Sequence, residues 1–369
     1  MVASAKGGRP MIKERLIKFG NILQEHQLDA IFIVNKANIR YLSGYTGDDA
    51  YLFITTKRRV LITDSRYTEQ AGRECAEYEV ITHHNPEASL MKIIKQLCAE
   101  AQVKQLAFER NYLSYLLFEK LQQALTGTAA LVPTGELAES LRYSKSPEEI
   151  MLMRQACAAT DKALQQICQY IRPGVSEKDI ARELLYAILS QGCESSFQII
   201  VASGNNGSLP HAIPSDKIVA NGEFITMDFG CCYQGYHADM TRTVFLGKPT
   251  SQQKERYELV LAAKQQAEAT LKSGIMGKTV DAAARDFLAR YGYGEYFCHG
   301  LGHGVGLDIH ENPSLNRISE QVLQSNCLVT VEPGIYLPGW GGIRIEDTVL
   351  ITDNGYESLF SSPLELLCL

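Results

Sequence analysis

The sequence contains no long run of residues of one chemical kind. Its apolar stretches fall well short of the roughly 20 residues that a membrane-spanning helix needs. No basic run is longer than Lys57-Arg58-Arg59, and the formal net charge of the 369 residues is −6. Nucleic-acid surfaces need clustered lysine and arginine. We therefore expect neither a membrane partner nor a nucleic-acid partner.

None of the ten cysteines stands in a Cys-x-x-Cys spacing, and the N-terminus lacks the apolar core of a secretion signal. Such a chain is expected to keep reduced, mostly buried thiols, which favours a cytoplasmic location. Cys231 and Cys232 are adjacent at the tip of a predicted hairpin, where a redox or soft-metal role is the alternative to simple burial. Residues 1–10 have the character of a vector-derived leader, with Met11 as the expected natural start.

A length of 369 residues favours two domains. In the first part of the chain, helical apolar patterns alternate with short apolar strands, which is typical of an α/β domain. No glycine-rich phosphate loop follows the first strand, so a nucleotide-binding role is not expected. The expected helices cover 13–27, 66–76, 87–101 and 113–125, and the expected strands cover 30–34, 50–55, 59–63, 78–82, 105–109 and 129–132.

A helix-start signal marks the boundary between the two domains. Ser146 is an N-cap residue, Pro147 occupies the first helical position, and Glu149 completes a capping box. We therefore place an N-terminal domain at 11–140 and a second domain at 141–369. In the second domain, helices that cover a curved, mostly antiparallel sheet give an α+β fold. Its expected helices are 147–170, 176–191, 251–273 and 279–291, and two of its expected strands are 197–202 and 223–228.

Five groups of metal-ligand type stand in separate segments of the second domain: Asp228, Asp239, His303, Glu332 and Glu346. Asp228 ends an apolar strand, and Asp239 opens the next one. A hairpin centred between positions 233 and 234 would place these two side chains opposite each other, with Cβ atoms about 5 Å apart. Glu332 and Glu346 are symmetric about a glycine-rich turn centred on position 339. The intervening Pro333 predicts a bulge or an irregular edge.

Four carboxylates that converge repel one another, and some of them would bind protons instead of ionising. Two divalent cations would cancel the four charges. Oxygen-rich ligation with a single imidazole suits Mn²⁺ or Co²⁺ better than Zn²⁺, whose structural sites favour thiolate and histidine. Bridging carboxylates would hold the cations roughly 3.5–4 Å apart. For each residue taken alone, a helix cap, a salt bridge or another structural role is the alternative.

Longer motifs surround these residues. They are Asp-Phe-Gly at 228–230, Asp-x-Thr-Arg-Thr at 239–243, Gly-His-Gly-x-Gly at 302–306, Val-Glu-Pro-Gly-Ile-Tyr at 331–336 and Gly-x-Arg-Ile-Glu-Asp at 342–347. Together they resemble the metal-dependent aminopeptidase family that includes prolidase, aminopeptidase P and methionine aminopeptidase, and most closely its proline-specific branch. The resemblance runs from about Ser146 to the C-terminus, and a weaker one covers about 12–140. It implies a pita-bread fold for the second domain and a creatinase-like α/β fold for the first, in which residues 38–44 resemble a segment that approaches the active site.

The resemblance implies a role for each of the five groups. Asp228 and Asp239 would bind one metal ion, and His303 would bind the other. Glu332 and Glu346 would take part in the shell that bridges the two ions.

Further roles are implied where positions match the family motifs. His211 and His310 match histidines that steady the substrate and the tetrahedral intermediate, and His299 matches another active-site histidine. Arg344 precedes Glu346 by two residues and so would share its sheet face, where it would support a ligand carboxylate. A structural ion pair is the alternative for Arg344.

The expected reaction is metal-assisted hydrolysis of a peptide bond, in which a water held between two cations becomes the nucleophile. Glu332 is the candidate proton carrier, and His310 is the candidate stabiliser of the tetrahedral intermediate. The resemblance implies removal of one N-terminal residue before a proline, by a homodimer. Trp340, the only tryptophan, is expected either to wall the proline pocket or to be structural.

Substrate length is the finer question. Prolidases of this type often carry arginine four residues after the histidine that matches His310, where it would hold the carboxylate of a dipeptide. Ser314 stands there, so an Xaa-Pro aminopeptidase acting on longer peptides is favoured, with an Xaa-Pro dipeptidase as the alternative. A non-catalytic peptide-binding module and a metal-free, creatinase-like hydrolase are also possible for the fold, but both should lack the complete ligand set.

Overall fold

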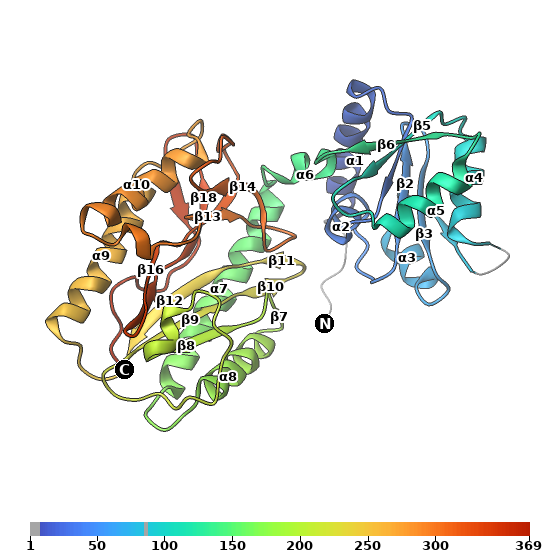
Figure 1. Cartoon of the computed structure of the whole chain (residues 1–369). Helices are drawn as coiled ribbons and strands as arrows, with labels where there is room; N and C mark the ends of the chain where they lie inside the picture. Colours follow the sequence, from blue (N-terminus) through green and yellow to red (C-terminus); the bar gives the residue numbers. More distant parts are fainter. Residues whose placement is uncertain (1–7, 85–87) are drawn as a thin grey trace. The chain divides into compact units, whose positions relative to one another are not determined.

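The structure is a computed structural model that describes residues 8–84 and 88–369. The chain divides into two compact units, Met1–Arg142 and Tyr143–Leu369, coloured blue to green and green to red in Figure 1. The expected leader lies outside the described residues up to position 7, and helix α1 already begins at Gly8. Within the described ranges, no helix has the length and apolar character needed to cross a membrane.

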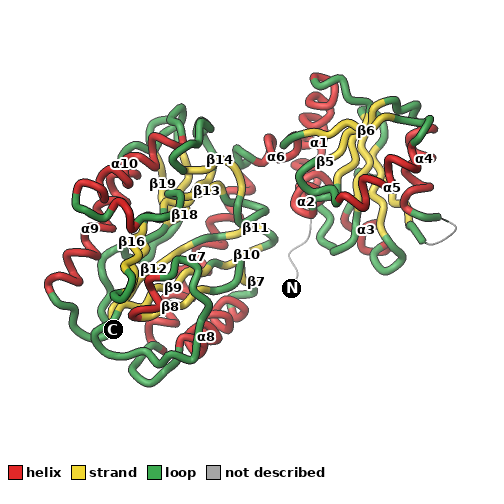
Figure 2. The backbone as a smooth tube through the Cα atoms, viewed as in Figure 1, coloured by secondary structure: helices red, strands yellow, loops and turns green. Residues whose placement is uncertain are grey.

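The first unit is built on one six-stranded sheet with the strand order β4-β3-β2-β1-β5-β6. Neighbouring strands pair antiparallel at β1–β2 and β2–β3 and parallel at the other three pairs. All four residues of β1 are buried, as is typical of a sheet with helices on both faces (Figure 2). The strands are β1 (Ala30–Ile33), β2 (Tyr51–Thr55), β3 (Arg59–Thr63), β4 (Glu79–Thr82), β5 (Gln105–Glu109) and β6 (Ala130–Thr134).

The expected α/β pattern of this unit is confirmed, and each of the six expected strands is present within two residues of its predicted bounds. Two short helices are additional. One of them, α2, is capped by Asn35 and buries six of its eight residues. The helices are α1 (Gly8–Glu25), α2 (Lys36–Ser43), α3 (Thr68–Glu74), α4 (Leu90–Glu100), α5 (Tyr115–Leu125) and α6 (Leu137–Arg142).

The second unit opens with helix α7 (Pro147–Tyr170), and the predicted capping box is present. The Ser146 hydroxyl accepts a hydrogen bond from the Glu149 N–H, and the Glu149 carboxylate accepts one from the Ser146 N–H. The expected bounds of this helix are confirmed. Helix α8 (Glu177–Ser190) begins with the same kind of cap at Ser176.

Each helix pair of the second unit packs on its own antiparallel strands. Helices α7 and α8 share one buried apolar cluster with β8, β9 and β12, and α9 (Ser251–Glu268) and α10 (Gly277–Arg290) share another with β15 to β18. In Figure 1 the two halves are green to yellow and orange to red. The expected helix-covered antiparallel architecture is confirmed. The other elements are β7 (Glu194–Ser195), β8 (Ile200–Ser203), η1 (Gly204–Ser208), β9 (Phe224–Phe229), β10 (Cys231–Tyr233), β11 (Tyr236–His237), β12 (Met240–Phe245), η2 (Gly294–Tyr296), β13 (Gly302–Gly304), β14 (Glu311–Leu315), β15 (Leu328–Val331), β16 (Gly334–Leu337), β17 (Gly341–Arg344), β18 (Asp347–Ile351) and β19 (Tyr356–Ser358).

The predicted register of the first acidic hairpin is wrong. Strands β9 and β12 pair Asp228 with Thr241, not with Asp239. The tip consists of Gln234 and Gly235, whose φ angles of 49° and 81° are those of a type I′ turn. Such a turn matches the twist of the flanking strands, so the hairpin is centred one residue later than predicted. Asp239 consequently lies two positions before the partner of Asp228, in the irregular segment that leads into β12.

The predicted register of the second acidic hairpin is confirmed. Strands β16 and β17 pair Gly334 with Arg344, and strands β15 and β18 pair Val331 with Asp347, both symmetrically about position 339. The ladder is interrupted at Pro333, between β15 and β16, as its missing N–H predicts.

Trp340 packs in the core, which favours the structural one of its two expected roles. Its ring packs on the apolar cluster beneath α9 and α10, with the Phe224 ring 5.6 Å away. The guanidinium of Arg256 lies 4.3 Å from the centre of the tryptophan ring. All ten cysteines are free thiols, and Cys231 and Cys232 are both buried.

The capping box of α7 gives a prediction for stability. Ser146→Ala removes the acceptor for the Glu149 N–H, and we expect it to lower the free energy of unfolding by about 1 kcal/mol in urea titrations. Ser146→Asp keeps an acceptor oxygen at the cap and should stay near wild type. An alanine variant with the unfolding midpoint of wild type would contradict the contribution of this cap.

Candidate metal centre

All nine side chains singled out in the sequence line one cavity of the second unit, which has a volume of about 270 Å³. The nine come from segments up to 135 positions apart, between 211 and 346. The remaining lining residues are apolar or glycine. The cavity is lined by Phe197, Ile200, Pro210, His211, Asp228, Asp239, His299, Gly300, Gly302, His303, Ile309, His310, Glu332, Arg344 and Glu346.

The four carboxylates stand where strands begin or end. Asp228 is the penultimate residue of β9, and Asp239 directly precedes β12. Glu332 directly follows β15, and Glu346 directly precedes β18. Asp228 keeps its place in the ladder, opposite Thr241 and Ile200. The other three lie just outside strands, where side chains are released from strict alternation and can turn into the cavity.

One imidazole stands among the carboxylates. The His303 Nε2 atom lies 3.5 Å from Asp239 Oδ2 and 3.5 Å from Glu332 Oε1. One ligand atom from each of Asp239, His303 and Glu346 falls within 4.8 Å of the other two. His303 Nδ1 is 3.0 Å from the Gly304 carbonyl oxygen, which can only accept. Nδ1 therefore carries the proton, and Nε2 presents a lone pair to the cavity.

The two carboxylate oxygens of Asp228 differ in their hydrogen bonding. Its Oδ2 accepts a hydrogen bond of 2.6 Å from Arg344 Nη2. Its Oδ1 is buried and has no hydrogen-bond partner among the described residues. Because buried polar atoms are almost always paired, this oxygen fits a site for a cation, and the hard oxygen donor set around it fits a divalent ion.

Electrostatics support the same conclusion. Burial and the neighbouring carboxylates raise the pKa values of Asp239 and Glu346 well above the usual range. Burial, together with Asp228, raises the pKa of Glu332 to about 8 even though Arg344 opposes it. Burial lowers the pKa of His303 to about 4. Without a cation, several of these acids would be protonated at neutral pH, whereas divalent ions would stabilise them as carboxylates.

The sequence did not reveal the residues that orient these carboxylates. The Thr241 hydroxyl donates to Glu346 Oε2 at 2.6 Å and accepts from Arg344 Nε at 3.0 Å. The Tyr336 hydroxyl accepts from Arg344 Nη1 at 2.8 Å and lies 2.8 Å from His299 Nε2. Thr241 stands two positions after Asp239, and Tyr336 lies on β16, which pairs with the strand β17 that carries Arg344. These short separations along the chain and across the hairpin were the available signals.

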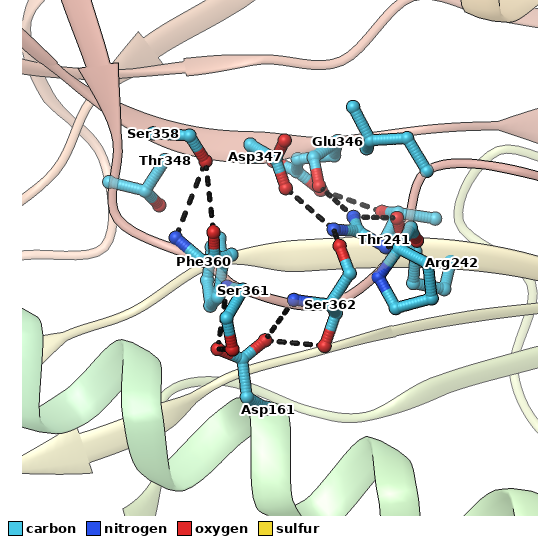
Figure 3. Close-up of polar contacts among 12 residues, drawn as sticks. Asp161, Thr241, Arg242, Glu346, Asp347, Thr348, Ser358, Phe360, Ser361 and Ser362 are labelled. Atoms are coloured by element: carbon cyan, nitrogen blue, oxygen red, sulfur yellow. Dashed lines mark hydrogen bonds and ion pairs between the residues drawn. The ribbon is translucent and has the colours of Figure 1, made fainter.

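A second polar layer lies behind Glu346 (Figure 3). The buried Arg242 donates to the Glu346 backbone oxygen and, at 2.7 Å, to Asp347 Oδ1. It also donates to the carbonyls of Ser362 and Pro363. The position of Glu346 is therefore fixed from its backbone as well as from its side chain.

Asp161 of α7 anchors the segment that Arg242 contacts. Its two carboxylate oxygens accept from the backbone N–H and the hydroxyl of both Ser361 and Ser362 (Figure 3). The Thr348 hydroxyl donates to the Asp239 carbonyl at 3.0 Å, which fixes a second ligand segment from behind.

His211, His299 and His310 line the same cavity as the four carboxylates. The rings of His303 and His310 have centroids 4.3 Å apart, and burial, together with the nearby His211, lowers the pKa of His310. Burial, followed by the charge of Arg344, lowers the pKa of His299 to about 4. Neutral imidazoles at neutral pH can donate or accept a single hydrogen bond toward a substrate.

The family model of metallopeptidase family M24 matches residues 151–353, more than half of the chain. The chain belongs to metallopeptidase family M24. The model of the creatinase/prolidase N-terminal domain matches residues 15–144. The family resemblance and the two-part fold expected from the sequence motifs are thus confirmed.

Relatives of this M24 chain match it over nearly its whole length. An uncharacterized peptidase of Bacillus subtilis is 41% identical over 96% of this chain and 100% of its own. The structure of an Xaa-Pro dipeptidase from Bacillus anthracis has a TM-score of 0.93 at 39% identity, covering 97% of this chain and 100% of that one. That of an X-Pro aminopeptidase from Thermotoga maritima has a TM-score of 0.89 at 36% identity, covering 96% and 99%.

The pKa shifts give a prediction for the metal-free protein. Between the ordinary value of Glu332 and about 8, the folded state holds a proton that the unfolded state has lost, so stability falls as pH rises. His303 acts oppositely: because its folded pKa is about 4, stability falls as pH drops from its ordinary value toward 4.

Added Mn²⁺ should displace the protons from the buried carboxyl groups of Asp239, Glu332 and Glu346. We therefore expect Mn²⁺ to raise the melting temperature relative to a sample treated with chelator. This rise should be larger at about pH 8 than at about pH 5.5. Differential scanning fluorimetry over this range measures it. An equal shift at both pH values would contradict a site built from protonatable ligands.

Proposed function

We propose that this protein is a metal-dependent exopeptidase that hydrolyses the bond between an N-terminal residue and a following proline. The observation that carries the proposal is the convergence of four carboxylates and one imidazole on a single cavity in an M24 chain. Two relatives named for Xaa-Pro dipeptidase and X-Pro aminopeptidase activity match the chain over at least 96% of its length. They support the proline-specific assignment.

Two divalent cations are the proposed cofactors, with Mn²⁺ favoured, then Co²⁺, then Zn²⁺, because oxygen donors outnumber nitrogen. When bound, they supply an acidified water and positive charge for the developing oxyanion. The residues that would hold them are Asp228, Asp239, His303, Glu332 and Glu346.

Glu332 is the proposed proton carrier. It faces the cavity, and the Thr330 hydroxyl lies 3.2 Å from its Oε1 atom and holds that oxygen in place. From there it takes a proton from the attacking water and returns it to the leaving nitrogen. The nitrogen of a peptide bond is a poor leaving group as an anion, so the proton has to be supplied for the product amine to leave.

The histidines and Arg344 have proposed supporting roles. His310 stabilises the tetrahedral intermediate, and His211 steadies the substrate from its own place in the lining of the same cavity. His299 acts through the Tyr336 hydroxyl, which Arg344 also contacts. Arg344 orients Asp228 and so acts on a ligand carboxylate and not on the substrate.

Peptides longer than two residues are the proposed substrates. Ser314 lies in β14 and is not among the described residues that line the cavity. Arg344, which does line it, is committed to Asp228, Thr241 and Tyr336. Among the described residues, the lining thus offers no free arginine or lysine for the carboxylate of a dipeptide, which favours an aminopeptidase. An Xaa-Pro dipeptidase is the second candidate, since the Bacillus anthracis relative carries that name.

A peptide-binding module and a metal-free hydrolase have less support. Neither would have a use for the complete ligand set that this cavity contains. A homodimer, a cytoplasmic location and the approach of residues 38–44 to the active site stay predictions. The division into an N-terminal domain at 11–140 and a catalytic domain at 141–369 accompanies this proposal.

Removal of a ligand should abolish hydrolysis without unfolding the protein. We expect Asp239→Ala and Glu346→Ala each to lower kcat on Ala-Pro-Ala by more than about 10³-fold, because the acidified water is lost. Glu320→Ala, which removes an exposed carboxylate, should leave kcat unchanged. Undiminished turnover by either ligand variant in chelated buffer would exclude the metal mechanism.

Substrate length can be measured directly. We expect a higher kcat/KM on Ala-Pro-Ala than on Ala-Pro, because Arg344 in the cavity lining is not free to bind the dipeptide carboxylate. Ala-Ala-Ala tests the requirement for proline and should be cleaved poorly. A strong preference for Ala-Pro would identify a dipeptidase.

A further inference from the structure

We propose that Glu177 is a positioning residue for His211. Glu177 is the first residue of α8, and His211 lies in the loop of residues 204–214, here called the His211 loop. The inference rests on the function proposed above, because it assigns to Glu177 the task of holding one wall of the substrate cavity. Three features carry it: a clamp at the two ends of the loop, a platform beneath it, and the chemistry of the clamping group.

The clamp is a single carboxylate that accepts six hydrogen bonds. Glu177 Oε1 accepts from the Ser203 N–H at 2.7 Å, the Ser203 hydroxyl at 2.8 Å and Asn206 Nδ2 at 3.1 Å. Oε2 accepts from the Ser215 N–H at 3.0 Å, the Ser215 hydroxyl at 2.7 Å and Asn206 Nδ2 at 3.1 Å. Ser203 and Ser215 are the residues directly before and after the His211 loop. The Glu177 side chain therefore links the two ends of this loop.

The backbone of the first turn of α8 also binds the residues that follow the His211 loop. The Glu177 N–H donates to the Lys217 carbonyl at 3.0 Å, and the Lys178 N–H donates to the Ser215 carbonyl at 3.1 Å. The Lys217 side chain contacts the residue before the loop, since its Nζ donates to the Ser203 hydroxyl at 2.8 Å. Both ends of the loop are therefore held by the first turn of α8.

The platform beneath the loop is strand β17. A Cβ atom on Gly207 would lie 2.9 Å from the Gly342 nitrogen, and one on Gly341 would lie 2.6 Å from the Gly204 oxygen, so the two backbones are in direct contact. Arg344, at the end of the same strand, donates to the Pro210 carbonyl at 3.2 Å. The loop is thus seated on the strand that also carries the guanidinium contacting Asp228.

Only a carboxylate satisfies this arrangement. The six hydrogen bonds come from five neutral donor atoms, and each donor needs an acceptor oxygen. A glutamine would offer one oxygen and would turn its own N–H₂ group against the donors on the other side. Glu177 is fully buried, so water does not replace the lost bonds. The expected effect of such a change is a loosened loop between Ser203 and Ser215, with α8 and the metal ligands retained.

The test is a double-mutant cycle between Glu177→Gln and His211→Ala, read as kcat/KM on Ala-Pro-Ala. We expect Glu177→Gln to lower kcat/KM at least about tenfold, since displacement of a positioned group by about 1 Å can cost 10²-fold. In the His211→Ala background the same change should add less than about twofold, because the group through which it acts is gone. Effects that multiply independently, or a wild-type kcat/KM in Glu177→Gln, would overturn the proposal.

Asp179→Asn is the matched control. It removes the same charge two residues further along α8, but Asp179 accepts from Ser176 and not from the His211 loop. We expect it to keep a kcat/KM within about twofold of wild type, although it weakens the capping box at the start of α8. A loss as large as that of Glu177→Gln would overturn the assignment, since helix stability alone would then explain both.

Hydrogen exchange provides a readout that does not depend on catalysis. In Glu177→Gln, amides of residues 203–215 should exchange at least about tenfold faster, and those of β9 should not change. Uniform acceleration across the unit, or unchanged exchange at 203–215, would overturn the clamp. If Glu177→Gln does not fold, Ser215→Ala removes one donor and is measured in the same way.

A wild-type protein that cleaves no Xaa-Pro peptide would refute the proposed function. The hydrogen-exchange result would still decide whether Glu177 clamps the His211 loop.

Discussion

Repulsion between buried like charges is the constraint around which the second unit is built. Asp228, Asp239, Glu332 and Glu346 face one small cavity, and burial raises the pKa values of the last three. Uncompensated charges in such a place cost more than most single contacts contribute, so the fold has to supply positive charge. Arg344 supplies part of it and is itself buried. The remaining deficit would favour a bound cation.

This constraint explains why the ligands occupy strand interruptions and why a second polar layer surrounds them. A regular strand would turn alternate residues away from the cavity, whereas the breaks beside β12, β15 and β18 release them. Released side chains need other restraints, which Thr241 supplies to the carboxylate of Glu346 and Arg242 to its backbone. The positions of the ligands thus depend on hydrogen bonds as much as on sheet geometry.

Features that depend on neighbouring residues could be predicted from the sequence pattern. Distant residues could be grouped into one site where their motifs resemble a known family, and other distant contacts could not be predicted. The start of α7 followed from Ser146 and Glu149, and the second acidic hairpin followed from its glycine-rich turn. The first acidic hairpin was misplaced because its tip puts Gln234, an unusual residue there, at positive φ. The two roles expected for Trp340 stayed open because a turn does not determine which face its side chains cover. Glu177 meets residues 26 and 38 positions away, and no local pattern marks such a contact.

The polar layer behind Glu346 draws on a part of the chain that is synthesised late. Arg242 binds the carbonyls of Ser362 and Pro363, a segment that follows every ligand group in the sequence. On the ribosome, the five ligand groups emerge before the residues that fix the backbone of one of them. The restraints on Glu346 are therefore complete only once translation has passed position 363, so a nascent chain has all five candidate ligands before it can fix the backbone of Glu346.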